Sequence, residues 1–198
     1  IKEHNQYINL VKKIDFSNKK VVNAKKKRVF IESFINHPTY TIPNCYISKI
    51  ISNYKNYYCC GILRSGDIKG QKMMNSFDID KIYFINDGNI FSRIYFTILS
   101  YRALQKTKSI KDLLNLKINK IECGISIYEQ YVRFKKDTNI HEIKNDFYIL
   151  LAKALILNKQ FEKIFKNHKD SFLVQSETMY FPFRIALQTA LKHNIKVV

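Results

Sequence analysis

The stretch SFLVQSETMYFPFRIALQTALKHNIKVV, residues 171–198, predicts a strand, a helix and a second strand in immediate succession. A short apolar run at 172–174 leads into a polar corner, whereas residues 182–193 carry apolar side chains at helical spacing. Pro182 suits the first turn of that helix, and the run at 195–198 is again apolar. A helix between two strands is the usual crossover in a parallel sheet. The stretch therefore predicts an α/β fold.

Three further pairs of a strand and a helix precede this stretch. Apolar runs predict strands at 29–31, 57–64 and 81–86. Helical spacing predicts helices from Pro43, over 71–77 and over 90–106. The segment INHPTYTIP is expected to be a loop, because its two prolines stand five residues apart. The strands are continuous apolar runs, which is typical of strands covered on both faces. We therefore predict a Rossmann-like parallel sheet with flanking helices, in which the strands at 29–34, 60–64 and 172–175 end at one edge.

The middle of the chain predicts a helical insertion. Residues 107–139 are less regular, and GISIYEQYVRFKK fits either a helix or an extended arm. Helical spacing returns from about 140 to 167. In the preceding long helix, one face carries Ile94, Ile98, Tyr101 and Leu104.

The domain organisation is expected to be simple. Residues 1–26 form a polar N-terminal extension, and residues 27–198 form one Rossmann-like domain. The last run, 195–198, is of the kind that lies inside a sheet. We therefore expect this sequence to be the N-terminal, acceptor-side part of a longer protein, cut before a C-terminal donor-binding domain, and to be inactive alone.

Composition limits the class of protein. The chain has 198 residues, is 46% hydrophobic and carries a net charge of +18, so it can form a core and is expected to meet anionic partners. The lysines are spread along the chain, and an AT-rich genome would equally explain them. No apolar run approaches the roughly 18 residues of a membrane span, and no signal peptide is evident. The four cysteines lack metal-binding spacing and are expected to be buried free thiols.

Several nucleotide-binding and catalytic motifs are missing from the sequence. The pattern GxGxxG does not follow the first strand, which disfavours a dinucleotide-dependent enzyme. The patterns GxxxxGK[ST] and GxSxG are also absent, which disfavours a P-loop enzyme and an α/β hydrolase.

Candidate site residues follow the strands, because ligands of open parallel sheets bind beyond the carboxyl ends of the strands. The polar residues in these positions are Glu32, Ser33, Asn36, His37, Arg64, Asp67, Ser176, Glu177, Tyr180 and Arg184. His37 and Glu177 are the candidate bases that would remove a proton from a hydroxyl group. Arg184 would hold an anionic group, and the unpaired N–H groups at the start of its helix would favour the same anion. Turns, helix caps and a Glu177–Arg184 ion pair remain ordinary alternatives.

A second candidate site lies in GISIYEQYVRF. Tyr128 and Tyr131 offer rings for stacking on a sugar, and Arg133 offers a fork for a phosphate or carboxylate. An amphipathic arm that packs on the domain explains these residues equally well.

Taken together, four segments resemble the N-terminal half of bacterial surface-polysaccharide glycosyltransferases of the two-domain GT-B type. They are ESFINHP, LRSGDIKGQKMMNSFDIDKIYFIND, GISIYEQYVRF and VQSETMYFPFRIALQTALKHNIKVV, and the resemblance covers most of residues 27–198. It implies that this half binds the acceptor and supplies the base, that the other half holds the nucleotide-activated donor, and that no metal or other cofactor is bound. In such enzymes an aspartate often stands where this chain has Glu129.

The resemblance leads to an expected function. A glycosyltransferase of capsule or lipopolysaccharide biosynthesis would move a sugar from a nucleotide-sugar donor to a surface-glycan or lipid-linked acceptor. Its location would be cytoplasmic, peripheral at the inner face of the plasma membrane, where lysines meet anionic lipid. Nucleic acid is disfavoured as a partner. The alternatives are a non-enzymatic basic α/β module that binds nucleic acid or a partner protein, and a transferase of a phosphate-containing group to a capsule sugar.

Overall fold

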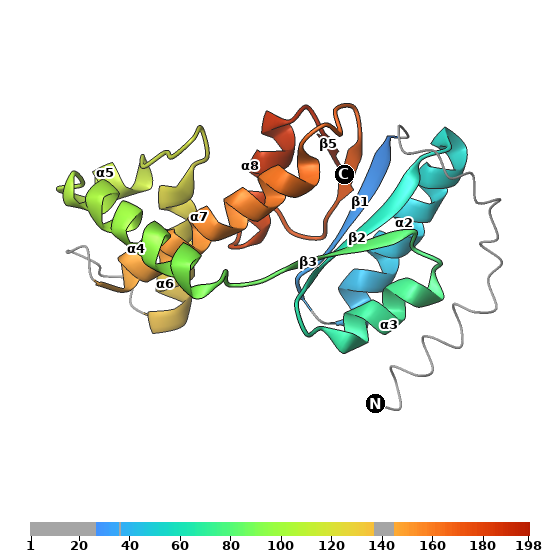
Figure 1. The fold of residues 1–198 in the computed structure, drawn as a ribbon, viewed down its shortest axis with the longest axis horizontal. Coiled ribbons are helices and arrows are strands. Elements are labelled where there is room, and N and C mark those ends of the chain that lie inside the picture. The colour runs from blue at the N-terminus through green and yellow to red at the C-terminus, as the bar shows by residue number, and fades with distance from the viewer. Residues whose placement is uncertain (1–26, 36, 137–144) are drawn as a thin grey trace. The chain divides into compact units, whose positions relative to one another are not determined.

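The structure is a computed structural model that describes residues 27–35, 37–136 and 145–198 (Figure 1). The chain divides into two compact units, each described by itself. The sheet unit contains the described residues up to 85, with 167–176 and 193–198. The helical unit contains the described residues of 86–166 and 177–192. The expected N-terminal extension, the candidate Asn36 and the start of the helix expected from 140 lie outside the described residues.

The sheet unit is built on five strands that are all parallel. They are β1 (Arg28–Ser33), β2 (Tyr58–Arg64), β3 (Lys81–Ile85), β4 (Phe172–Val174) and β5 (Lys196–Val197), in the order β3-β2-β1-β4-β5. In this register Ile31 lies opposite both Gly61 and Val174. The carboxyl ends of β1, β2 and β4 therefore meet at one edge, and the predicted Rossmann-like α/β sheet is confirmed.

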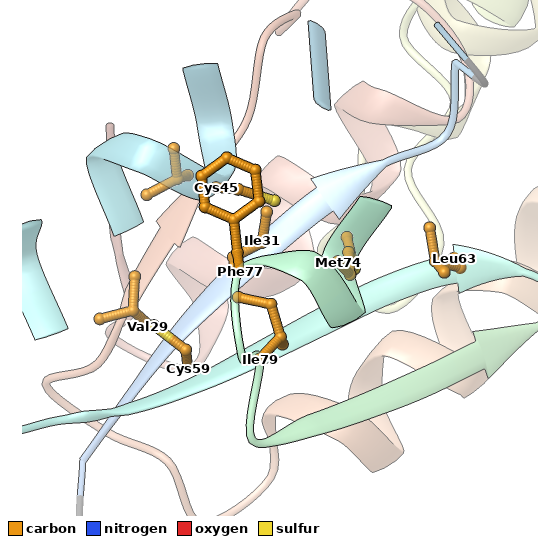
Figure 2. Close-up of a cluster of buried hydrophobic side chains, with 9 residues drawn as sticks. Val29, Ile31, Cys45, Cys59, Leu63, Met74, Phe77 and Ile79 are labelled. Carbon is orange, nitrogen blue, oxygen red and sulfur yellow. The ribbon is translucent and has the colours of Figure 1, made fainter. Parts of the chain in front are cut away.

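A compact apolar cluster fixes α2 (Pro38–Lys55) and α3 (Ile68–Ser76) on one face of this sheet. Side chains of a strand alternate between its two faces, so Val29 and Ile31 point to the same side. Figure 2 shows them with Cys45 of α2, and with Met74 of α3 over β2. The complete cluster of buried residues is Val29, Ile31, Cys45, Cys59, Leu63, Met74, Phe77, Ile79 and Val174.

Helix α2 corrects one expectation, because residues 38–43, expected to belong to a loop, are helical. The helix begins at Pro38 and continues through Pro43. Proline at the first helical position loses nothing, since that N–H has no partner within the helix. Pro43 removes one hydrogen bond near the helix start, and tertiary contacts compensate: the hydroxyl groups of Thr41 and Ser33 lie 2.6 Å apart in the interior.

The helical unit is arranged around α7 (Asn145–Phe165), which packs against three other helices. These are α4 (Ile90–Gln105), α6 (Cys123–Lys135) and α8 (Phe183–Lys192), and a short α5 (Ile110–Leu114) packs on α6. The Thr189 hydroxyl donates to the Asn158 side-chain oxygen at 3.0 Å, which joins α8 to α7 in the interior. Residues 123–135, for which an extended arm was the alternative, are helical.

All four cysteines are free and buried, as predicted. Burial raises the pKa of Cys59 to about 11 and the pKa values of Cys60 and Cys123 to about 12. Burial also raises the pKa of Cys45, strongly and in the same direction. These thiols are therefore protonated near neutral pH and poorly reactive.

Candidate functional site

Glu32 and Ser33 are the last residues of β1, and their side chains make contacts inside the protein rather than facing a ligand. Both side chains are buried. The Glu32 carboxylate accepts hydrogen bonds from the Phe34 N–H and, at 3.4 and 3.3 Å, from the N–H and hydroxyl of Ser176. Three of the predicted residues thus meet at the carboxyl ends of β1 and β4, where the hydrogen bonds join the two strand ends.

His37 caps the N-terminus of α2. Its Nδ1 accepts a hydrogen bond from the Thr39 N–H at 3.3 Å, and its ring is exposed. A neutral imidazole that accepts through Nδ1 carries its hydrogen on Nε2. In this arrangement His37 offers solvent a donor, which does not suit the base expected at this position.

Arg64 and Asp67 flank the turn after β2. Asp67 caps α3, because its carboxylate accepts a hydrogen bond from the Gly70 N–H at 2.8 Å. Arg64 is exposed at the end of the strand. The Asp67 position is explained by helix capping, whereas Arg64 is available to a ligand of the sheet edge.

In the helical unit, the turn before α8 corrects a second expectation. The helix begins at Phe183, and the N–H of Arg184 donates to the Tyr180 carbonyl at 2.9 Å. The N–H groups of Ile185 and Ala186 both donate to the Pro182 carbonyl, at 3.1 and 3.2 Å. The predicted anion site at this helix N-terminus is therefore wrong, because these backbone donors already have carbonyl partners.

Glu177 closes the same turn. One carboxylate oxygen accepts hydrogen bonds from the N–H groups of Thr178 and Met179, at 2.8 and 3.0 Å. Such bonds hold the carboxylate against the backbone. Glu177 thus closes a local turn rather than capping α8, which begins at Phe183, and its use as a base would require this turn to open.

Arg184 lies between two carboxylates. Its guanidinium nitrogens are 3.6 Å from Glu122 and 3.8 Å from Glu129, and only 17% of its side chain is exposed. Both separations exceed the 2.7–3.2 Å of a normal hydrogen bond. The carboxylates therefore balance the charge of Arg184 without saturating its donors, which remain suited to an anionic ligand.

The second predicted site converges on the first. The Arg133 guanidinium of α6 stacks 3.8 Å from the centre of the Tyr180 ring, and Glu129 of the same helix faces Arg184. Two stretches that are about fifty residues apart in the sequence thus form one cluster in the helical unit.

The two tyrosines predicted in α6 differ in their surroundings. Tyr131 is 3% exposed and stacks on Phe147 with ring centres 4.5 Å apart. Its ring belongs to the core, so the sugar-stacking role expected of it does not fit. Tyr128 is half-buried and Tyr180 is 36% exposed, so neither ring belongs to the buried core.

The carboxyl groups of Glu122 and Glu129 differ in pKa. Desolvation raises the pKa of Glu129 more than Arg184 and Arg133 lower it, and one of its oxygens is buried without a hydrogen-bond donor among the described residues. Lys117, 3.0 Å away, lowers the pKa of Glu122, and Arg184 adds to this effect. Among these carboxyl groups Glu129 is the better proton acceptor near neutral pH.

A cavity of about 630 Å³ adjoins Arg184 in the helical unit. Its walls combine three cations and the Glu122 carboxylate with amide, hydroxyl and apolar groups, a mixture that suits a sugar bearing a negative charge. The Gln188 amide donates to Glu122 at 3.2 Å, and Lys192 pairs with Glu162 at 2.5 Å. The lining residues are Lys120, Glu122, Thr178, Met179, Arg184, Leu187, Gln188, Leu191 and Lys192.

Sequence reasoning missed most of this lining. Gln188 and Lys192 follow Arg184 at intervals of four, and residues four apart share a face of a helix. Extending that row along α8 would have found both. Glu122 and Lys120 precede α6, and no spacing pattern in the sequence points to them.

In the parts of the chain that the structure describes, no three His, Cys, Asp or Glu side chains lie close enough to hold a metal ion. Across the same residues, no helix is both long and apolar enough to cross a membrane. Comparison of the chain with protein-family models, with curated proteins and with solved structures gave no match.

Proposed function

We propose that this chain is the acceptor-binding part of a glycosyltransferase that builds a bacterial surface polysaccharide, either a capsule or a lipopolysaccharide. The acceptor would be a glycan or a lipid-linked sugar with a phosphate or carboxylate group. The donor would be a nucleotide-activated sugar. The Rossmann-like sheet is compatible with this class of enzyme, although many unrelated functions use the same fold.

The observation that carries the proposal is the cluster around Arg184. Two of the segments that resemble glycosyltransferases, 124–134 and 174–198, supply its members from α6 and from α8 with its preceding turn. The cluster joins a guanidinium with unsaturated donors, a carboxyl group with a raised pKa and an exposed tyrosine ring, and of these three groups the guanidinium lines the cavity. Binding of an acidic sugar and proton removal from its hydroxyl group need these groups.

The proposed roles follow from the geometry. Arg184 and Lys120 bind the negative group of the acceptor, and the ring of Tyr180, held by Arg133, packs on the sugar. Glu129 accepts the proton of the attacking hydroxyl group. The alternative bases are His37 and Glu177, although Glu177 is hydrogen-bonded within its turn. Measuring transfer activity after substitution of each of the three residues would show which one is the base.

Direct binding tests the acceptor site. We expect the protein to bind glucose 1-phosphate more tightly than glucose in isothermal titration calorimetry, because only the phosphate engages Arg184. Arg184→Gln should weaken binding of glucose 1-phosphate at least about tenfold, since a hydrogen bond to a charged group contributes about 1.5–3 kcal/mol. Lys163→Gln is the matched control: it removes one positive charge from an exposed position of α7 and should leave binding unchanged.

Two outcomes would contradict the proposal. Equal affinity for glucose and glucose 1-phosphate would show that the site does not recognise the negative group. Tighter binding of a single-stranded oligonucleotide, measured by fluorescence anisotropy and unaffected by Arg184→Gln, would favour the non-enzymatic basic module. Transfer of a phosphate-containing group, rather than of a sugar alone, would be recognised from the mass of the product.

A further inference from the structure

Helix α4 exposes a large apolar surface. Six of its large apolar side chains are between 49% and 79% exposed, and they are Ile90, Phe91, Ile94, Tyr95, Ile98 and Tyr101. Contiguous apolar surface of this kind on a soluble unit marks an interaction site more often than chance exposure. Three of the four residues expected on one face of this helix thus face solvent, and Leu104 alone is buried.

The exposed side chains form one continuous outer face, which we call the α4 face. Residues three and four apart are neighbours on a helix, so 90, 94, 98 and 101 make one row and 91 and 95 make a second. The opposite row, Phe96, Ser100 and Leu104, is buried where α4 packs on α7 (Figure 1). Helix α4 is therefore apolar on both sides, and only one side is used inside the helical unit.

Most charged residues on α4 and next to it in the sequence are positive. The helix contains Arg93 and Arg102 and no acidic residue. From 86 to 120 the sequence has seven lysines and arginines and two aspartates. An anionic surface complements this set of charges, because each Lys or Arg near such a surface contributes about 1 kcal/mol at moderate salt.

A separate groove of about 270 Å³ lies between α4 and α7, and from α4 it is lined by Arg93 and Thr97 rather than by the residues of the α4 face. Arg93 is fixed at its rim, since its Nε donates to the carbonyls of Asp87 and Gly88 at 3.2 and 3.1 Å. Lys153 is exposed on the facing helix, and Ile149 and Ile156 form apolar walls. The groove thus combines two cations and one carboxylate, Asp87, with apolar walls, and its net charge is positive.

We propose that the α4 face docks the protein onto a lipid bilayer that contains anionic lipids. The apolar side chains enter the level of the headgroups, and Arg93, Arg102 and Lys153 contact lipid phosphates. A second copy of the chain is a poorer occupant, because self-pairing of this face brings arginines together with no acidic residue on the helix to neutralise them. The inference goes beyond the proposed reaction, since docking involves neither donor nor acceptor.

Vesicle binding tests the docking surface. The protein should co-sediment with vesicles of phosphatidylcholine and phosphatidylglycerol much more than with phosphatidylcholine alone. The triple substitution F91Q, I94Q and I98Q should lower the partition coefficient at least about tenfold, because each buried apolar side chain contributes about 1.5–3 kcal/mol. Glutamine favours helix at least as well as isoleucine and phenylalanine, so α4 itself is retained. Arg102→Gln should lower the partition coefficient roughly fivefold at low salt, and high salt should abolish this difference.

The matched control is on α2, which also exposes apolar side chains. The triple substitution I47Q, I50Q and Y54Q changes three side chains that are 39%, 53% and 81% exposed and should leave vesicle binding unchanged. Equal losses from both triple variants, or no loss from the α4 variant, would overturn the proposal. A change from dimer to monomer on substitution of the α4 face, seen by light scattering, would assign that face to a second copy instead.

An optical probe gives an independent readout. The 198-residue chain has no tryptophan, so Phe91→Trp introduces a single reporter on the α4 face. Its emission should shift to shorter wavelength with anionic vesicles and be quenched by brominated lipid chains. Tyr54→Trp on α2 should do neither. The absence of a shift and of quenching for Phe91→Trp would show that α4 does not enter the bilayer.

Discussion

Glu129 and Glu122 are both close to Arg184, yet their environments give them opposite properties. Glu122 has Lys117 at 3.0 Å and is partly exposed, which favours its charged form. Glu129 has a buried oxygen and loses more by desolvation than it gains from the arginines. A carboxyl group with a raised pKa is less stable when charged in the folded state than in the unfolded chain. Glu129 is therefore retained at a cost in stability, as functional residues often are.

Substitution of Glu129 should separate stability from activity. Because the folded pKa lies above the unfolded value, the cost of the charge is absent at pH below the unfolded pKa and develops as pH rises through the folded pKa. We expect Glu129→Gln to raise the urea midpoint of unfolding at pH 7 and to leave it unchanged near pH 3. The same variant should lower sugar transfer by the complete enzyme at least about a hundredfold, as loss of a general base does.

The opposite outcome for Glu129 is equally measurable. A lower urea midpoint at pH 7 would make Glu129 a stabilising partner of Arg184. Glu129→Met, which removes the polar atoms as well as the charge, distinguishes a charge effect from a lost hydrogen bond. Glu177→Gln serves as the comparison for activity, because its carboxylate closes a turn.

At the level of the elements, the start of α6 depends on one glycine. A Cβ atom at Gly124 would lie 1.7 Å from the carbonyl oxygen of Leu113, and the Gly124 N–H donates to the Leu116 carbonyl at 3.0 Å. The Leu113 carbonyl belongs to the backbone, so it cannot move away by a rotamer change as a side chain could. Helix α6 can therefore approach α5 closely enough to place Glu129 and Arg133 only with glycine at this position.

Gly124→Ala should destabilise the protein by about 2 kcal/mol or more, as overpacking of a close contact does. The sign is informative, because the same change in an unhindered helix stabilises by up to about 1 kcal/mol. Thermal unfolding followed by circular dichroism measures it, with Gln130→Ala in the same helix as a near-neutral control. A stabilised Gly124→Ala variant would show that α5 and α6 are not packed this closely.

The elements also show what sequence could and could not predict. Each strand and nearly every helix were predicted, because buried parallel strands and amphipathic helices leave strong periodic signals. The start of α2 was missed, since Pro38 costs nothing at the first helical position and hydrogen bonding to β1 offsets the bond that Pro43 removes. The prediction of unpaired N–H groups at the start of α8 was wrong, because they donate to the carbonyls of Tyr180 and Pro182.

At the level of the whole molecule, the candidate site was predicted as separate pieces. Sequence identified Arg133, Tyr180 and Arg184 individually, and the rule for parallel sheets directed attention to the strand ends. What joins α6 to α8 is packing within the helical unit, and no periodicity in the sequence encodes that contact. Glu122 and Lys120 were missed for this reason, and Tyr131 was misassigned because an aromatic core residue and a sugar-stacking residue look alike in sequence.

Each unit contains at least one buried cysteine, whose labelling can report the unfolding of that unit. Cys45, Cys59 and Cys60 belong to the sheet unit and Cys123 to the helical unit, and a thiol that is buried and protonated is alkylated only when its surroundings open. Iodoacetamide pulses in rising urea, read by peptide mass spectrometry, should therefore label Cys123 and Cys45 at different urea concentrations. Labelling of both at one concentration would mean a single cooperative transition. Rapid labelling without urea would mean that the interior is open. The chain thus reports, without any added probe, whether the helical unit unfolds while the sheet unit stays folded.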